Sequence, residues 1–316
     1  MTRHLRPLLS ALVALCLSGM SHAASLHAIV IADTSDSSIG TSVAIDAGNI
    51  KDELRNIAQA TGMTLNINEL VGSQMTNAGI TRAIADASPG KDDVLFFYYS
   101  GHGYRTKQTP TKWPMMYIKD QPMDFSDILA KLRTKGARLV IATSDSCNSF
   151  VDEGRNRAIP RASQPKASSY RTLFLGYKGF IAASGSSPGE YSWGDDTNGG
   201  RYTINFLGAL HEQGARDNPT WIGVMSQAKT PIRVSQQGQT YVQTPQVEVD
   251  VVTVSQAGQD NGTTTVTPPP EKPTKPDKPT KPDKPTPPPV QPTQPTTPPQ
   301  KQCTLNDYIK GTPGCK

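Results

Sequence analysis

Two stretches decide the fold: "DDVLFFYYSGHGYR" at residues 92–105 and "ARLVIATSDSCNSF" at residues 137–150. Each opens with a continuous apolar run, which predicts a strand buried on both faces. Each then turns abruptly into a polar loop, the first carrying His102 between two glycines and the second carrying Cys147. Because ligands bind beyond the carboxyl ends of strands in parallel sheets, we expect the chemistry of this protein in these two loops.

The sequence around these stretches alternates between apolar runs and segments with helical spacing. Further strands are predicted at residues 26–33, 63–70 and 178–184, and helices at 47–61, 76–87, 125–136 and 201–214. Such alternation is typical of an α/β domain whose mostly parallel central sheet is covered by helices on both faces. We therefore predict one domain over residues 25–256.

Residues 1–23 have the pattern of a secretory signal peptide. Arg3 and Arg6 precede the apolar segment "PLLSALVALCLSG", and small residues lead up to a predicted cleavage after Ala23. The apolar segment is too short to span a membrane, and Leu15 before Cys16 disfavours a lipid anchor. We expect an exported protein, located in the periplasm, in the cell envelope or outside the cell.

The chain ends in two low-complexity segments. Residues 261–302 are rich in Pro, Thr and Lys and repeat the motif KPTKPD, which predicts a disordered, extended spacer. The spacer is either a stalk through a cell wall or away from a surface, or a plain linker. Residues 303–316 hold Cys303 and Cys315, for which a disulfide is expected in an exported protein. This loop is a candidate attachment or recognition element.

The formal charge of +5 does not describe the domain. The leader holds two arginines and no acid, and the tail from Asn261 holds eight lysines and four acids, which leaves −1 for residues 24–260. A domain of that charge lacks the basic surface typical of nucleic-acid binding. We expect neither a nucleic-acid partner nor stable insertion into a membrane.

The pairing of Cys147 with His102 suits nucleophilic catalysis. A free thiol is mostly protonated at neutral pH, and a nearby imidazole activates it and later protonates the leaving amine. The backbone N–H groups of Gly103 and Cys147 are candidates for an oxyanion hole. Taken singly, each motif has a plainer explanation, because a lone cysteine at a strand end is often a small buried apolar residue and SGHG is a tight turn.

Several motifs in this order resemble one family. They are "YYSGHG" (98–103), "DSCNS" (145–149), "GFIAASGSSPGEYSWGDD" (179–196), "FLGAL" (206–210) and "QTPQVE" (243–248). Across about residues 27–248 the chain resembles caspase-like cysteine peptidases, and the metacaspase branch in particular. The resemblance implies a caspase-like three-layer α/β sandwich with His102 and Cys147 as the catalytic dyad.

The same resemblance suggests which side chain the enzyme selects. Caspases that cut after Asp carry pocket arginines after the first strand and in a Ser-Trp-Arg loop, whereas this chain has "IADTSD" (31–36) and Ser192-Trp193-Gly194. Metacaspases cut after Arg or Lys, and their acidic pocket residues match Asp145 and Asp46, with Ser100 before the histidine turn. Trp193 either walls a neighbouring subsite or is a buried core residue.

Four positions in these motifs have more than one interpretation: Asp46, Asp145, Asn148 and Phe150. Asp145 also suits a turn that binds backbone N–H groups, and Asp46 suits the start of a helix. Asn148 and Phe150 replace the His and Gly that metacaspases usually have at the nucleophile. No cofactor is predicted, and calcium is left open because Asp152 and Glu153 do not make a full set of oxygen ligands.

The segment from Asp152 to Arg171 is basic and polar, and we expect it to be exposed. A pocket for basic side chains beside a basic loop predicts self-cleavage. The candidate sites are Arg155, Arg157, Arg161 and Lys166. The alternative is an ordinary solvated loop.

The sequence thus favours an exported cysteine endopeptidase that hydrolyses peptides or proteins after Arg or Lys. One alternative keeps the fold as a catalytically weak or inactive peptide-binding protein, for which Phe150 is mild support. Another is a structural or adhesion protein of the cell envelope, in which the stalk and the Cys-loop carry the function.

Overall fold

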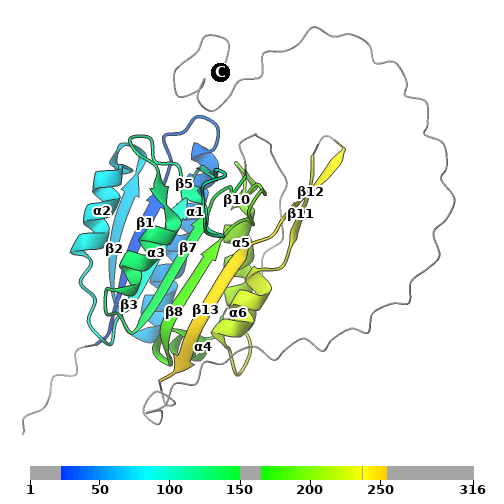
Figure 1. The fold of residues 1–316 in the computed structure, drawn as a ribbon. Helices are drawn as coiled ribbons and strands as arrows, with labels where there is room; N and C mark the ends of the chain where they lie inside the picture. Colours follow the sequence, from blue (N-terminus) through cyan, green and yellow to red (C-terminus); the bar gives the residue numbers. More distant parts are fainter. Residues whose placement is uncertain (1–22, 150–164, 237, 255–316) are drawn as a thin grey trace, which may run out of the picture.

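The computed structural model describes residues 23–149, 165–236 and 238–254. A six-stranded sheet forms the centre, in the order β13-β8-β7-β3-β1-β2 (Figure 1). Its strands are β1 (Ser25–Ala32), β2 (Thr64–Val71), β3 (Val94–Ser100), β7 (Leu139–Asp145), β8 (Tyr177–Ser184) and β13 (Gln246–Thr253). The first five run parallel, and β13 pairs antiparallel with β8 at one edge.

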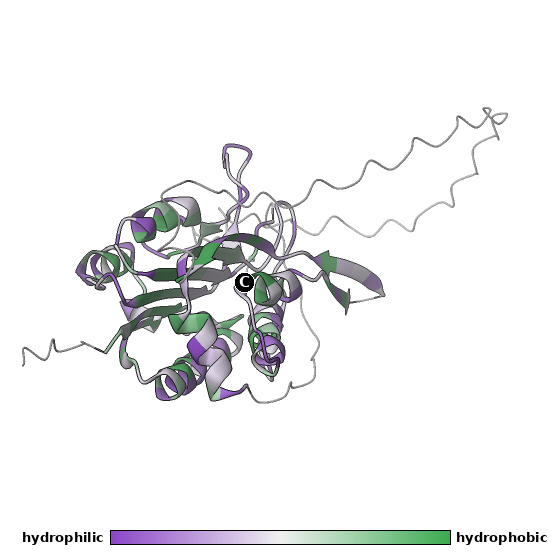
Figure 2. Cartoon of the chain, turned by 90° about the horizontal axis from the view of Figure 1, so that it is seen from below, coloured by the Kyte–Doolittle hydropathy of each residue, from purple (hydrophilic) through white to green (hydrophobic). Residues whose placement is uncertain are grey.

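Helices cover both faces of this sheet. They are α1 (Gly40–Thr61), α2 (Asn77–Asp86), α3 (Phe125–Arg133), α4 (Ala167–Leu175), α5 (Arg201–Gly214) and α6 (Trp221–Ala228). Successive side chains of β3 enter opposite cores: Phe96 packs with α1, α4, α5 and α6, and Phe97 packs with α2 and α3. Figure 2 shows mostly apolar strands, with polar residues gathered on the outer sides of the helices. The predicted three-layer α/β architecture is confirmed.

Several short strands lie at the edge of the sheet where β3 and β7 end. One small sheet joins β4 (Gly103–Tyr104), β5 (Met115–Met116) and β6 (Met123–Asp124). A second hairpin joins β9 (Gly194–Asp195) and β10 (Gly199–Gly200). A third, β11 (Ile232–Gln236) with β12 (Gln239–Gln243), stands out from the body in both views (Figures 1 and 2).

The predicted elements are present, but some bounds and several elements were not anticipated. Helix α1 begins at Gly40, seven residues before the predicted start, because Asp36 forms a turn whose carbonyl accepts the N–H of Gly40 at 2.9 Å. Helices α4 and α6 and strand β13 were not among the predicted elements. Their stability depends on packing, as in the hydrogen bond from the Trp221 indole to the carbonyl of Leu173 at 2.8 Å.

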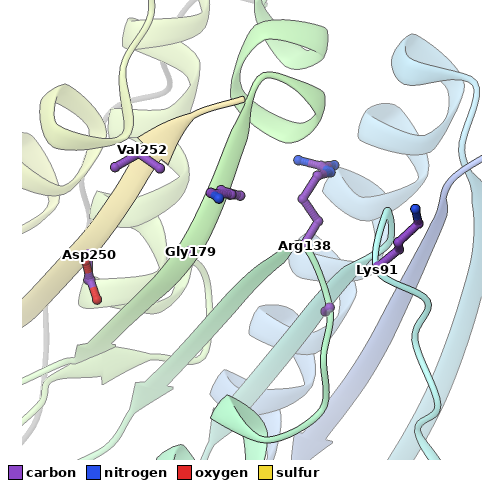
Figure 3. A pocket seen from close by; sticks show the side chains of 7 residues that line it. Lys91, Arg138, Gly179, Asp250 and Val252 are labelled. Atoms are coloured by element: carbon purple, nitrogen blue, oxygen red, sulfur yellow. The ribbon is translucent and has the colours of Figure 1, made fainter. Parts of the chain in front are cut away.

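The other end of the sheet carries an open cavity of about 290 Å³ (Figure 3). It is lined by Lys91, Ala137, Arg138, Lys178, Gly179, Asp250 and Val252. The guanidinium of Arg138 donates to the carbonyls of Asp92, Phe174 and Tyr177. It thereby connects the starts of β3, β7 and β8 with the end of α4. Strand β7 separates Arg138 from the loop of Cys147, residues 146–149, which we call the nucleophile loop. This cavity therefore lies roughly 25 Å from the nucleophile loop.

No helix among the described residues is long and apolar enough to cross a membrane. The predicted leader, the Pro-rich spacer and the loop of Cys303 and Cys315 lie outside the described residues.

Candidate active site

The ends of β3 and β7 are level with each other. Ser100 and Asp145 are register partners on these neighbouring parallel strands, and the N–H of Gly101 donates to the carbonyl of Asp145 at 3.3 Å. His102 and Cys147 each lie two residues beyond this pair. The structure therefore brings the two predicted loops together at the carboxyl edge of the sheet.

Gly103 allows the two loops to touch. A side-chain carbon at this position would overlap both the carbonyl oxygen of Cys147 and the side chain of Ser146. The histidine turn thus packs with its backbone directly against the backbone of the nucleophile loop. This close approach is the physical reason for glycine after His102.

The thiol of Cys147 lies against the Ser-Trp loop, residues 192–194. The N–H of Ser192 donates to Sγ at 3.3 Å, and Sγ lies 3.5 Å from the carbonyl oxygen of Ser192. Cys147 is partly exposed, whereas its neighbours Ser146 and Asn148 are buried. The N–H and the carbonyl of Ser192 thus fix the position of the sulfur.

The imidazole of His102 is held by groups that precede α1. Its Nε2 lies 3.3 Å from Oγ of Ser38 and 3.5 Å from Oδ1 of Asp36. The carbonyl of His102 accepts hydrogen bonds from the Tyr99 hydroxyl at 2.7 Å and from the N–H of Tyr117 at 2.9 Å. Asp36 was not among the predicted site residues.

Asp46 and Asp145 lie behind the dyad as a buried acidic pair. Asp46, on α1, accepts hydrogen bonds from the Ser100 hydroxyl at 2.8 Å and from the N–H of Gly200 at 2.7 Å. Asp145, at the end of β7, accepts from Ser192 Oγ at 2.6 Å and from Thr203 N and Oγ1 at 2.9 and 2.7 Å. The predicted residues Asp46, Asp145 and Ser100 therefore share one site, and Ser100 is the bridge from β3 to Asp46.

The glycine hairpin, residues 194–200, closes this acidic pair from the outside. A side-chain carbon on Gly200 would overlap the carboxylate of Asp145 and lie 2.8 Å from Asp46 Oδ2, and one on Gly199 would overlap Asp46. Asp46 is 1% exposed and Asp145 is 6% exposed. In this arrangement a basic side chain reaches the two carboxylates only after the glycine hairpin moves.

Burial raises the pKa of both carboxyl groups. For Asp46 the loss of water has the largest effect, and the negative charge of Asp145 raises the pKa further. For Asp145 the loss of water raises the pKa although Ser192 and Thr203 donate hydrogen bonds to it. A cation between the two groups would lower both pKa values.

Buried polar atoms without a hydrogen bond to any other described residue lie near both ends of the glycine hairpin. They are Oδ2 of Asp195 and the Nε and Nη2 atoms of Arg201.

Asn148 braces the nucleophile loop. Its side chain is fully buried, donates to the carbonyls of Lys112 and Ser186 at 2.8 and 3.2 Å, and accepts from Arg105 at 2.8 Å. The departure from the metacaspase pattern at this position therefore has a structural role. Phe150 lies outside the described residues.

Trp193 is 2% exposed and packs with Tyr191, Ile232, Val234 and Tyr241 under the β11–β12 hairpin. Its ring does not reach the surface in this arrangement, as the buried-core alternative anticipates. A role in a substrate subsite stays a prediction, as does the oxyanion hole of Gly103 and Cys147.

Of the proposed cleavage positions, the structure describes only Lys166. Its backbone N–H donates to the carbonyl of Gly214 at 3.0 Å, and its Nζ pairs with Asp217 at 2.8 Å. Arg155, Arg157 and Arg161 lie outside the described residues, as do Asp152 and Glu153. Within the described ranges, no group of three or more His, Cys, Asp or Glu side chains is placed to hold a metal ion.

Comparison with known proteins identifies one matching family. The model of the caspase domain family matches residues 27–254, which include β3, β7 and both loops. Among solved structures, caspase-1 from Spodoptera frugiperda is 16% identical, covers 73% of this chain and 90% of its own, and has a TM-score of 0.46. A protein from Geobacter sulfurreducens is 19% identical, covers 58% of this chain and 80% of its own, and has a TM-score of 0.39. A search of curated proteins found no match.

The family match covers more than half of the chain and runs through the whole central sheet. The chain belongs to the caspase domain family.

Proposed function

We propose that this protein is a cysteine endopeptidase that uses Cys147 and His102 and cleaves after Arg or Lys. Membership of the caspase domain family supports a cysteine-peptidase type of function. The observation that carries the proposal is the direct packing of the histidine turn on the nucleophile loop at the level ends of β3 and β7. The substrate is then a peptide or protein segment, and export of the enzyme remains part of the proposal.

The reaction follows from these groups. The thiol of Cys147 gives its proton to His102, and sulfur attacks the carbonyl carbon of the scissile bond. The N–H groups of Gly103 and Cys147 would bind the oxyanion that forms. His102 returns the proton to the leaving amine, which departs and leaves a thioester on Cys147. His102 then removes a proton from water, and the hydroxide releases the acid product and restores the thiol.

The preference for a basic side chain rests on Asp46 and Asp145. Both are buried, and an Arg or Lys of the substrate would supply the positive charge that compensates them. For this side chain to enter, the glycine hairpin has to swing away, and Gly200 N then releases Asp46. A basic substrate is therefore expected to favour the open position of the hairpin.

The first prediction concerns cleavage itself. With fluorogenic peptides ending in Arg, Lys, Asp or Ala, the full chain is expected to cleave after Arg and Lys, because only these residues compensate the acidic pair. Cys147→Ala is expected to abolish cleavage, and Asp145→Asn to reduce kcat/KM for basic peptides roughly tenfold or more. Cleavage that persists without the thiol would refute the mechanism. Failure of the unaltered chain to cut any peptide would favour a peptide-binding protein.

The second prediction concerns self-cleavage in the segment between β7 and α4. The intact chain is expected to cut itself after Arg155, Arg157 or Arg161. Cutting after Lys166 is expected to be slowest. This residue lies at the start of α4, and its backbone N–H donates to the carbonyl of Gly214. Mass spectrometry of the incubated chain would identify the cuts, with Cys147→Ala as the control. If both chains stay equally intact, self-processing is excluded.

The third prediction concerns stability. The raised pKa of Asp46 means that the folded state holds this proton more tightly than the unfolded one. This carboxyl therefore supports folding below its ordinary pKa of 3.8, and the support is lost as the pH rises through the raised value. At pH about 7, Asp46→Asn is expected to raise Tm by roughly 2–4 °C, equivalent to about 1 kcal/mol.

The gain should shrink toward pH about 4, where Asp46 is protonated in the folded protein. Thermal melts of the intact chain across this range would measure it. Asp52→Asn on the same helix is the matched control, because Asp52 is exposed. A lower Tm for Asp46→Asn at neutral pH would contradict the idea that the acidic pair is held at the expense of stability.

A further inference from the structure

The loop before α1 contains a short motif, Asp36-Ser37-Ser38, that reaches the catalytic histidine. The carboxylate atom Oδ1 of Asp36 accepts hydrogen bonds from Ser38 N at 2.8 Å, from Ser38 Oγ at 2.6 Å and from Ile39 N at 3.2 Å. These bonds fix the orientation of the carboxylate before α1 begins. The same oxygen lies 3.5 Å from His102 Nε2, and Ser38 Oγ lies 3.3 Å from it.

The domain contains a second copy of this local motif, which separates the two roles. Asp124-Phe125-Ser126 begins α3, and Oδ1 of Asp124 accepts from Ser126 N at 2.8 Å and from Ser126 Oγ at 2.6 Å, the same distances as at Asp36. No ion pair with histidine is found for Asp124 among the described residues. The turn at Asp124 therefore caps α3 directly, whereas the turn at Asp36 lies four residues before the start of α1 and contacts His102.

The charge of Asp36 is available to the imidazole. Asp36 is partly buried, and its pKa lies well below the ordinary range, first because of the hydrogen bond with His102 and then because of those with Ser38. It is therefore ionised at every pH at which the peptidase would work. A fixed negative charge near Nε2 stabilises the imidazolium form of a histidine.

We propose that Asp36, supported by Ser38, is the positioning residue of the His102–Cys147 dyad. With Ser38 Oγ, its carboxylate holds the Nε2 side of the imidazole, which leaves Nδ1 as the nitrogen that exchanges a proton with the thiol. It also stabilises the positive charge that His102 acquires when it takes the proton of Cys147. This inference rests on the proposed function for its catalytic meaning, but the interaction itself is measurable without a substrate.

Other groups around His102 set the background of the measurement. Tyr117 lies edge-on to the imidazole, with ring centroids 6.3 Å apart, and the Tyr99 hydroxyl binds the His102 carbonyl. Asp33, at the end of β1, is paired with Lys119 at 3.5 Å, and Cys147 lies across the loop contact. Burial raises the pKa of the Tyr99 hydroxyl above its ordinary value, so it stays protonated near neutral pH. The charges of Asp36 and Cys147 are therefore expected to have the largest effect on the titration midpoint of His102.

The test is a histidine NMR titration of the full chain in a Cys147→Ala background, which removes the thiol and prevents self-cleavage. The signal of His102 is the one lost in His102→Ala. Asp36→Asn keeps an amide oxygen for the N–H groups of Ser38 and Ile39 but removes the charge. The midpoint of His102 is expected to move to lower pH in Asp36→Asn. It is expected to stay in place in Asp124→Asn, which matches the local change elsewhere.

Kinetics complete the test in the chain that retains Cys147. Asp36→Asn is expected to lower kcat/KM roughly tenfold or more, with the larger part in kcat, because Asp36 acts through His102. The limb of the pH profile that reports His102 should shift in the same direction as the NMR midpoint. Asp36→Glu, which keeps the charge, is expected to restore part of both.

An unchanged His102 midpoint in Asp36→Asn would overturn the proposal, whatever the activity. If Asp36→Asn does not fold, Asp36→Ser takes its place, because serine also forms such turns and carries no charge. If the unaltered chain cleaves no peptide, the proposed function fails. The NMR midpoints then still decide whether Asp36 controls the imidazole.

Discussion

The register of β3 on β7 is the constraint on which the site depends. Because Ser100 and Asp145 are paired, the polar loops that follow them leave the sheet at the same height. The side chains of this pair also belong to the buried acidic site. Ser100 donates to Asp46 on α1, and Asp145 accepts from Thr203 on α5. A slip of one residue would turn each of these side chains to the other face. The apolar runs that fix this register therefore also fix the positions of the His102 and Cys147 loops and of the buried acidic pair.

The second constraint is the burial of two acids beside the nucleophile. Their pKa values are raised, and only neutral donors and the glycine hairpin satisfy them in the described structure. A natural protein retains such an arrangement where function needs it, since perturbed carboxyl groups gather at functional sites. A substrate that brings a positive charge would compensate both acids.

Sequence was enough to predict the parts that depend on local pattern. Continuous apolar runs followed by polar loops predicted β3 and β7, and with them the contact between the loops that carry His102 and Cys147. Asp36 was missed because Asp-x-Ser before a helix is a common local turn, as the copy at Asp124 shows, and its contact with His102 is 66 residues away along the chain. The brace at Asn148 and the closure by Gly199 and Gly200 depend on long-range packing, which no short motif encodes.

The most direct test of the account is covalent labelling of the intact chain with peptidyl chloromethyl ketones that end in arginine or in aspartate. The adduct would be located by mass spectrometry. The account predicts that the arginine reagent labels Cys147 far faster than the aspartate reagent, because only arginine can open the glycine hairpin and reach Asp46 and Asp145. Equal or faster labelling by the aspartate reagent, or labelling only at other residues, would contradict it.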